Sequence, residues 1–208
     1  MIINYHEDTA LIRALEALEK DNVFVYPTDT IYGFGGNANS LKILDKLYFL
    51  KQRPENMPVS MIVRNKDMIS EYAHVSITAE RLIDKFLPGA LTLVLPAKNK
   101  ILPDKLFNLE GFLGFRIPDH EFCRAMTRDF NRPIITSSVN LSGKAPLNDI
   151  NSINDLFGKE VDLMISDPKL DSKTEPLSST VVMILKDGSM KVLREAAIPA
   201  SQLNKVLA

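Results

Sequence analysis

Two segments about 85 residues apart contain the residue types that could bind a polyanion. The first contains Lys51 and Arg53 at the expected end of a helix, and the second is the hydroxyl- and amide-rich run 136–143. Fixed cations that face neutral hydrogen-bond donors can stabilise charge on a transferring phosphoryl group without a side-chain nucleophile. The two segments therefore predict chemistry on a nucleotide.

Each of these segments also has a simpler interpretation. Lys51 and Arg53 could complement the dipole of their helix and face water, and the hydroxyls of 136–143 could form a turn that bonds its own backbone. Two further arginines favour the anion site, because Arg116 and Arg194 each end an expected strand. A guanidinium in that position can hold a carboxylate or phosphate with two hydrogen bonds, although arginines at strand ends are often salt-bridged.

A third segment, residues 27–36, follows an expected strand directly and contains Thr28, Asp29, Tyr32 and three glycines. Ligand sites of sheet proteins tend to lie at strand ends, and glycine lets the backbone come close to a ligand. The spacing matches neither the dinucleotide fingerprint nor the P-loop, so a plain turn between two strands is an equal alternative. Asp29 could act only as a local turn-former. We assign no histidine a role as general base.

The elements that must position these residues alternate between helices and strands. Helices are expected from Asp8 or Thr9 to about Leu18, from Leu41 to about Lys51 after a Ser40 cap, at 78–87 and at 122–128. Strands are expected at 23–26, 58–63, 91–95, 113–117, 133–136, 161–165, 180–185 and 190–193. This order predicts an α/β (α+β) fold with a mixed sheet flanked by helices.

Apolar residues at helical spacing predict the inward faces of the first two helices. The faces are Leu11, Ile12, Leu15 and Leu18 in the first, and Leu41, Leu44, Leu47 and Tyr48 in the second. Pro54 is expected to stop the second helix, because proline disfavours the helical conformation in the residue before it. Residues 167–179 are predicted to be a structureless loop that could act as a lid or binding loop.

Composition limits the class of protein. With 208 residues and 45% hydrophobic content, residues 1–208 are expected to form one domain. The net charge of −1 argues against a surface that is basic throughout, so any anion site must be local. The single cysteine, Cys123, excludes a disulfide framework, and the three histidines have no zinc spacing, so no metal site is expected. No apolar run reaches the roughly 18 residues of a membrane span, and we expect a cytoplasmic protein.

Six motifs in order resemble those of the TsaC/YrdC family of L-threonylcarbamoyladenylate synthases. They are residues 27–33, 51–54, 88–92, 115–120, 138–143 and 179–182. Any one of them alone would be weak, but the ordered set is specific and extends over nearly the whole chain. The chain resembles the short, single-domain form of the family.

The resemblance implies an open, twisted YrdC-like mixed sheet with a large concave cavity that is positively lined. It implies a nucleotidyltransferase that makes threonylcarbamoyl-AMP and pyrophosphate from L-threonine, bicarbonate and ATP, with magnesium accompanying the ATP. The product would serve the modification of an adenosine in tRNA. The implied partners are a tRNA threonylcarbamoyl transferase complex that takes over the product and, more weakly, tRNA or double-stranded RNA.

The resemblance also implies roles for ten residues. The catalytic residues that hold the triphosphate and carbamate groups would be Lys51, Arg53, Ser138 and Asn140. The threonine contacts would be Thr28, Tyr32 and Arg116, the last at the carboxylate, and the residues along the nucleotide would be Thr136, Ser179 and Arg194. Five residues depart from the usual family pattern, namely Met57, Ile62, Val139, Glu195 and Ala196. Glu195 is expected to neutralise part of the charge of its neighbour Arg194.

Two other functions fit the same motifs. One is a non-catalytic paralogue of this fold that binds RNA or a nucleotide in the cavity. The presence of Lys51 with Arg53 and of Ser138 with Asn140 argues against it, because a binding module does not need the complete set. The other is a carbamoyl-transfer module of a larger maturation protein, which is disfavoured because the chain contains no acylphosphatase or zinc-finger segment.

Overall fold

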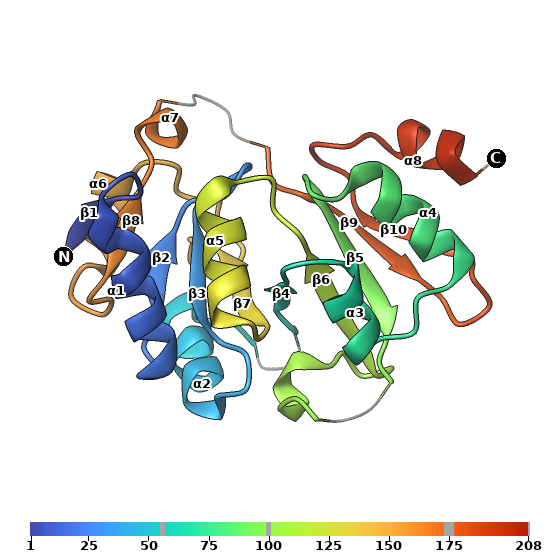
Figure 1. Cartoon of the computed structure of the whole chain (residues 1–208), viewed down its shortest axis with the longest axis horizontal. Helices are drawn as coiled ribbons and strands as arrows, with labels where there is room; N and C mark the ends of the chain where they lie inside the picture. Colours follow the sequence, from blue (N-terminus) through green and yellow to red (C-terminus); the bar gives the residue numbers. More distant parts are fainter. Residues whose placement is uncertain (55–56, 99–100, 173–176, 208) are drawn as a thin grey trace.

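The computed structural model describes residues 1–54, 57–98, 101–172 and 177–207 of the chain. These residues form a ten-stranded sheet in the order β1-β8-β2-β3-β7-β4-β6-β5-β9-β10 (Figure 1). The strands are β1 Ile2–Asn4, β2 Phe24–Tyr26, β3 Gly33–Asn37, β4 Ser60–Ile62, β5 Leu91–Pro96, β6 Phe112–Arg116, β7 Ile134–Ser138, β8 Met164–Ser166, β9 Thr180–Ile184 and β10 Met190–Arg194. Four neighbouring pairs are parallel and five are antiparallel, so the predicted mixed sheet is confirmed.

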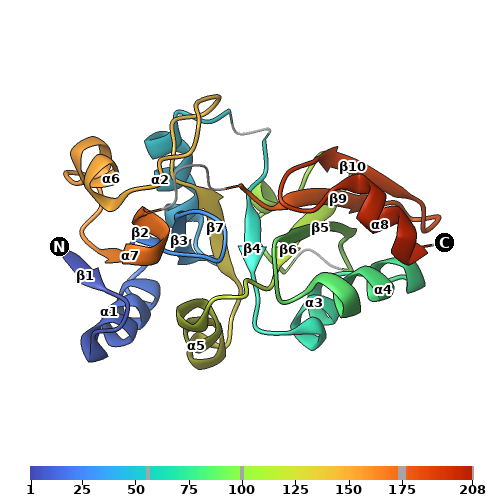
Figure 2. The same ribbon diagram turned by 90° about the horizontal axis from the view of Figure 1, so that it is seen from above.

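Helices lie on both sides of this sheet. They are α1 Asp8–Glu19, α2 Leu41–Lys51, α3 Lys66–Tyr72, α4 Ile77–Phe86, α5 Glu121–Phe130, α6 Ile150–Phe157, α7 Pro168–Asp171 and α8 Ala200–Leu207, with a 3-10 turn at Asp104–Leu106. Seen from above, α1 and α5 lie on one side of β2, β3 and β7, and α2 lies on the other (Figure 2). None of the helices in the described ranges is long and apolar enough to cross a bilayer.

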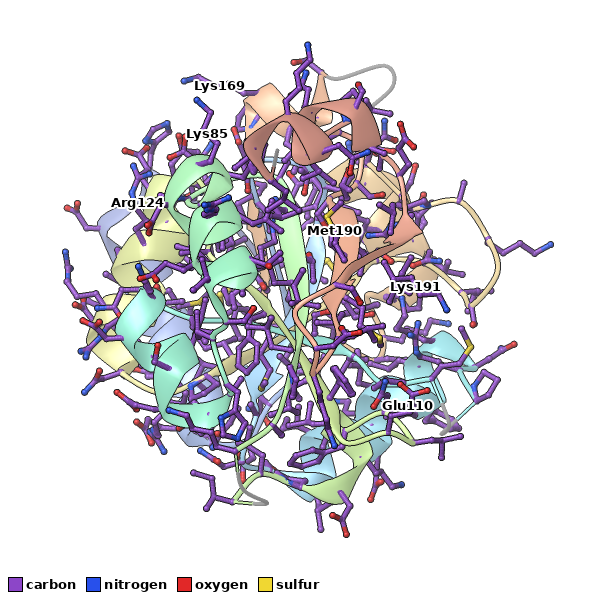
Figure 3. The ribbon with its side chains drawn as sticks, turned by 90° about the vertical axis from the view of Figure 1, so that its right-hand side faces the viewer. Lys85, Glu110, Arg124, Lys169, Met190 and Lys191 are labelled. Atoms are coloured by element: carbon purple, nitrogen blue, oxygen red, sulfur yellow. The ribbon has the colours of Figure 1, made fainter. Side chains whose placement is uncertain are left out.

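The core is divided between the two faces of the sheet. Alternation along β2 directs Phe24 and Tyr26 to the side of α1 and α5, and Val25 to the larger cluster on the other side. On the outer surface, charged side chains such as Lys85, Arg124 and Lys191 point away from the molecule (Figure 3).

Two of the predicted helix faces need correction. In α1 the predicted Leu18 is buried, together with Ala10, Ala14 and Ala17, and the predicted Leu11 and Leu15 are partly buried against the core. The predicted Ile12 is 57% exposed. In α2 the predicted Leu41 is exposed and Ile43 is buried in its place, although the predicted Ser40 cap is confirmed.

Several elements were not predicted: β1, β3, α3, α6, α7 and α8. The prediction of a structureless loop over 167–179 is wrong at its start, because Asp167 caps α7 through a hydrogen bond from the amide of Lys169. Residues 173–176 of that loop lie outside the described residues, so its proposed action as a lid stays a prediction.

Candidate functional site

A cavity of about 400 Å³ opens over one face of the middle strands. Its floor includes Ser60, Gly114, Thr136 and Ser138. The register places Ser60 opposite both Gly114 and Thr136, so their side chains share one face of the sheet. A Cβ added at Gly114 would lie 2.6 Å from the Ser60 hydroxyl oxygen. The small side chains of Ser60 on β4, Gly114 on β6 and Thr136 on β7 therefore leave room for the cavity.

Eight of the ten predicted site residues line this cavity. They are Thr28, Tyr32, Arg53, Arg116, Thr136, Ser138, Ser179 and Arg194. The remaining two, Lys51 and Asn140, lie behind the wall and expose only 1% and 9% of their surfaces. The structure thus brings together segments that are far apart in the sequence, and it divides them into a lining and a support.

Lys51 supports the wall from inside the protein. Its ammonium nitrogen donates to the carbonyl oxygens of Ser138 and Asn140 and, at 2.8 Å, to Asn140 Oδ1. These three acceptors use all three N–H donors of an ammonium group, so Lys51 has none left for a ligand in this conformation. Burial lowers the pKa of Lys51 to about 7, and the charge of Arg53 adds to this effect. We therefore interpret Lys51 as a positioning residue.

Arg53 stands just beyond the end of α2 and reaches the cavity. Gln52 adopts a left-handed conformation (φ 48°) that ends the helix and turns the chain. The Arg53 guanidinium donates to the carbonyl oxygens of Met57 at 2.8 Å and Pro58 at 3.0 Å, which fixes its direction. Burial lowers the pKa of Arg53. The family departure at Met57 thus contributes a backbone contact, whichever side chain stands there.

Arg116 closes β6 and is held by the loop that follows β2. Its guanidinium forms an ion pair with Asp29 Oδ1 at 2.6 Å and donates to Thr30 Oγ1 at 2.8 Å and to the Gly89 carbonyl at 3.2 Å. The Thr28 hydroxyl in turn donates to the Ile31 carbonyl at 2.6 Å and shapes the loop. Asp29 is therefore more than the turn-former considered from the sequence.

Replacing Asp29 by asparagine tests this support. For threonine, the substrate that the resemblance implies, the change should raise the KM about tenfold, and it should lower the free energy of unfolding by about 3 kcal/mol, because it leaves the buried Arg116 charge without its carboxylate. Steady-state kinetics and urea unfolding would measure both. Asp119→Asn is the matched control, since Asp119 pairs with an exposed arginine, Arg124. An unchanged threonine KM would contradict the assigned role of Asp29.

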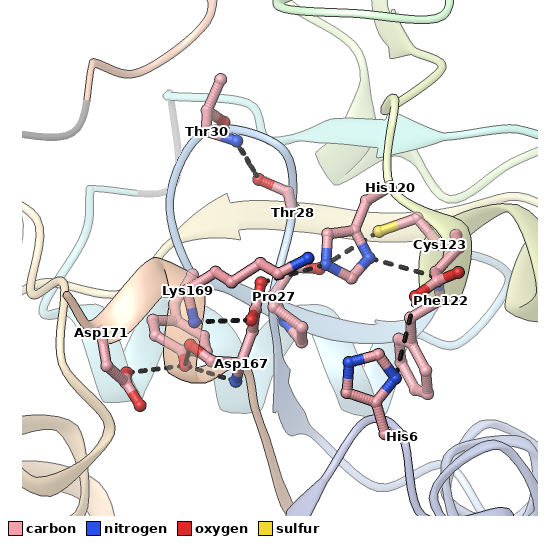
Figure 4. A network of polar contacts seen from close by, with 12 residues as sticks. His6, Pro27, Thr28, Thr30, His120, Phe122, Cys123, Asp167, Lys169 and Asp171 are labelled. Carbon is pink, nitrogen blue, oxygen red and sulfur yellow. Dashed lines mark hydrogen bonds and ion pairs between the residues drawn. The ribbon is translucent and has the colours of Figure 1, made fainter. Parts of the chain in front are cut away.

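Tyr32 connects the cavity wall to α7. Its hydroxyl accepts a hydrogen bond from the Asp167 amide and donates to Asp171 Oδ1, both at 2.8 Å. The Asp167 carboxylate, at the start of α7, accepts from the Lys169 amide and lies 3.4 Å from His120 Nε2 (Figure 4). The ring of Tyr32 lines the cavity, but its hydroxyl is engaged with α7. The predicted contact of Tyr32 with threonine stays a prediction.

The far wall of the cavity holds Ser179 and Arg194. The Arg194 guanidinium donates to the Ser179 carbonyl, and the Ser179 hydroxyl shares a 2.8 Å hydrogen bond with Thr92. Partial burial lowers the pKa of Arg194, and the nearby charges of Arg116 and Arg53 contribute. All three arginines line the same cavity. The structure does not pair Glu195 with Arg194, because Glu195 Oε1 accepts a hydrogen bond from the Ala200 amide at the start of α8.

Sequence reasoning missed part of this site. Asp29, Thr30 and Thr92 hold the predicted residues in place, and Asn108 joins the lining. Thr92 lies in the family motif at residues 88–92, and this motif is the sequence signal that could have identified it. In the described ranges, no group of three or more His, Cys, Asp or Glu side chains is placed to hold a metal ion. Asp29 is paired with Arg116.

Three arginines line one cavity together with neutral hydroxyls on one face of a mixed sheet, which is the composition expected of an anion-binding α/β protein. The Sua5/YciO/YrdC family model, whose description is "Telomere recombination", matches residues 16–196. The chain therefore belongs to this family, and the resemblance seen in its motifs is confirmed.

Relatives of the chain carry a common name. The chain is 36% identical over 195 residues to a Methanocaldococcus jannaschii protein named "Putative threonylcarbamoyl-AMP synthase", with 92% of this chain and 89% of that protein covered. It is 29% identical over 202 residues to the threonylcarbamoyl-AMP synthase of Bacillus subtilis, of which it spans 57% while 96% of this chain is covered. It is thus shorter than some relatives.

A solved structure adds a ligand to this comparison. The crystal structure of P. abyssi Sua5 in complex with L-threonine superposes with a TM-score of 0.89 and 25% identity. The match covers 100% of this chain and 61% of that protein. The open mixed sheet flanked by helices is therefore the fold of this family.

Proposed function

We propose that the chain makes L-threonylcarbamoyl-AMP and pyrophosphate from L-threonine, bicarbonate and ATP, as a nucleotidyltransferase. The observation that carries the proposal is the convergence of Arg53, Arg116 and Arg194 on one cavity floored by the hydroxyls of Thr136 and Ser138. The name shared by the relatives and the threonine bound to P. abyssi Sua5 support the same substrates.

The reaction needs two anions to meet. The threonine amine and bicarbonate would give a carbamate and water, and a carbamate oxygen would then attack the α-phosphorus of ATP and displace pyrophosphate. Two such charges 4 Å apart repel each other by about 4 kcal/mol at an effective dielectric constant of about 20. Alignment and charge compensation would therefore supply most of the catalysis, without a covalent intermediate on the protein.

The arginines would divide this work. The guanidinium of Arg116 has five N–H donors, of which its three protein contacts leave two for the threonine carboxylate. Arg53 and Arg194 lie on the sides of the cavity where they would hold the triphosphate. Magnesium would arrive on the phosphates of ATP, as it usually does in sites that offer few carboxylates. Lys51 and Asn140 would act from behind by fixing the segment that contains Ser138.

The product would be passed on. We infer that residues 1–208 work as one domain and hand threonylcarbamoyl-AMP to a tRNA threonylcarbamoyl transferase complex in the cytoplasm. The net charge of −1 fits an enzyme that binds tRNA or double-stranded RNA weakly rather than tightly. The continuity of one sheet through all ten described strands supports the single domain.

Pyrophosphate release from ATP tests the proposed function. The purified chain should release pyrophosphate when both L-threonine and bicarbonate are present, and much less when serine replaces threonine or when bicarbonate is removed. Mass spectrometry should detect threonylcarbamoyl-AMP in the first mixture alone. Nucleotide binding without any release would instead identify the non-catalytic paralogue and overturn the proposal.

A further inference from the structure

Tyr26 reaches the cavity wall from a buried position. It is the last residue of β2, and its side chain is fully buried and absent from the cavity lining. Its hydroxyl donates a 2.8 Å hydrogen bond to Thr136 Oγ1 on β7, although β3 lies between these two strands. Thr136 does line the cavity. A phenol in the core is therefore bonded directly to a hydroxyl of the site.

Two glycines of β3 make this reach possible. The register places Gly33 opposite Tyr26 and Gly35 opposite Thr136, on the same face of the sheet. A Cβ at Gly35 would come 2.8 Å from the Tyr26 ring, and one at Gly33 would come 3.3 Å from Thr136 Oγ1. The ring therefore crosses β3 over bare backbone. Any side chain at Gly35 would push the ring away from Thr136.

The bond from Tyr26 sets the polarity of the Thr136 hydroxyl. Among the described residues, Tyr26 is the hydrogen-bond partner of this hydroxyl, and the hydroxyl accepts. Its own proton is then directed to the cavity. The hydroxyl of Ser138, two residues further along the same face, has the opposite polarity. It donates to Asn140 Oδ1 at 2.6 Å and leaves its lone pairs toward the cavity. The wall thus offers a donor and an acceptor side by side.

We propose that Tyr26 is a positioning residue that fixes the Thr136 hydroxyl as a hydrogen-bond donor to an anionic substrate oxygen. The inference rests on the proposed function, in which phosphate and carbamate oxygens are the acceptors at this wall. A hydrogen bond to an anion is stronger than one between neutral groups, and a donor that is oriented beforehand needs no rearrangement when the substrate arrives.

A double-mutant cycle tests the proposal. Thr136→Val should lower kcat/KM by about 10-fold to 100-fold, because a donor to an anion is lost, and Tyr26→Phe by about 3-fold to 10-fold. The double variant should be no worse than Thr136→Val alone, because Tyr26 acts only through Thr136. Thr136→Ser keeps the hydroxyl and should lose less activity than Thr136→Val, and adding Tyr26→Phe to it should lower its activity further. Losses that multiply in the double variant, or a Tyr26→Phe variant with wild-type kinetics, would overturn the proposal.

Binding measurements separate this proposal from the proposed function. Calorimetry without turnover would measure the affinities for ATP and for threonine of the wild type, Thr136→Val, Tyr26→Phe and the double variant. For the ligand whose oxygen Thr136 contacts, the double variant should bind no more weakly than Thr136→Val alone. Coupling with ATP would identify a phosphate oxygen, and coupling with threonine in bicarbonate a carbamate oxygen. Absence of pyrophosphate release from the wild type would refute the proposed function. The coupling in binding would still test whether Tyr26 acts through Thr136. Thermal unfolding of each variant would show whether a loss of activity reflects a loss of folded protein. Gly35→Ala offers a second way to displace the Tyr26 ring from Thr136.

Discussion

Replacing Arg53 by alanine is expected to lower the rate of pyrophosphate release by a factor of order 100 or more, the usual effect of losing a preoriented group that stabilises charge. The Arg53 guanidinium lies in the cavity lining and is held by two backbone carbonyl oxygens, so its charge has a fixed position. In the part of the chain that the structure describes, its hydrogen bonds go to these two backbone oxygens, so the free energy of unfolding should change by only about 1 kcal/mol. Initial rates and urea unfolding would measure the two effects.

Two controls sharpen this prediction. Arg53→Lys keeps a positive charge but loses the planar fork that binds phosphate with two hydrogen bonds, so its activity should fall between the wild type and alanine. Arg128→Ala removes an exposed arginine that pairs with Asp129 on α5 and should leave the rate unchanged. Near-wild-type release by Arg53→Ala would remove Arg53 from the site.

Much of the frame around the site could be predicted from local sequence signals. Ser40 and Pro54 bracket α2, so the sequence pattern alone is enough to place Lys51 and Arg53 at a helix end. Arg116 and Arg194 do end β6 and β10. These signals are local, and local chemistry of caps, proline and strand ends decides them.

What could not be predicted depends on contacts between distant segments. The segment Gly33–Asn37 forms β3 although glycine is depleted in strands, because β2 and β7 pair with it on both sides and need its bare backbone. The family resemblance implies that Lys51 helps to hold the triphosphate, which stays a prediction, and no sequence signal indicated that the fold buries its ammonium group against Ser138 and Asn140. The pairing of Asp29 with Arg116 joins residues 87 positions apart and leaves no local signal.

Replacing Lys51 by methionine should lower both activity and stability, in contrast to Arg53→Ala. The change keeps most of the side-chain volume but leaves two carbonyl oxygens and Asn140 Oδ1 without their buried donor. Loss of such a charged donor should cost about 3 kcal/mol or more of unfolding free energy, and a mobile Ser138 segment should cut pyrophosphate release by a factor of order 100. Urea unfolding and initial rates would measure both losses. Full stability together with lost activity would instead mean that Lys51 turns outward to bind the substrate.

Deprotonation of Lys51 should change the stability and the activity of the wild type in opposite directions: stability should rise with pH, and activity should fall. Burial lowers the pKa of Lys51 from 10.5 to about 7, so between these values the unfolded chain binds a proton that the folded chain has released. The free energy of unfolding should therefore rise as the pH increases from about 7 to 10.5, and this gain should be lost again as the pH falls back toward 7. Below about pH 7 the titration of Lys51 should not change the free energy of unfolding. Activity should fall as the pH rises above about 7, because a neutral amine has two N–H donors for three acceptors.

Arg53→Gln provides the control for this pair of trends. The charge of Arg53 contributes to the lowered pKa of Lys51, so its removal should raise that pKa and move the lower limit of the stability window to higher pH. Because the readout is unfolding, it does not depend on the activity that this variant loses. Lys51→Met should lack the rise in stability altogether, and a wild-type stability that falls or stays level across the window would show that burial does not lower the pKa of Lys51.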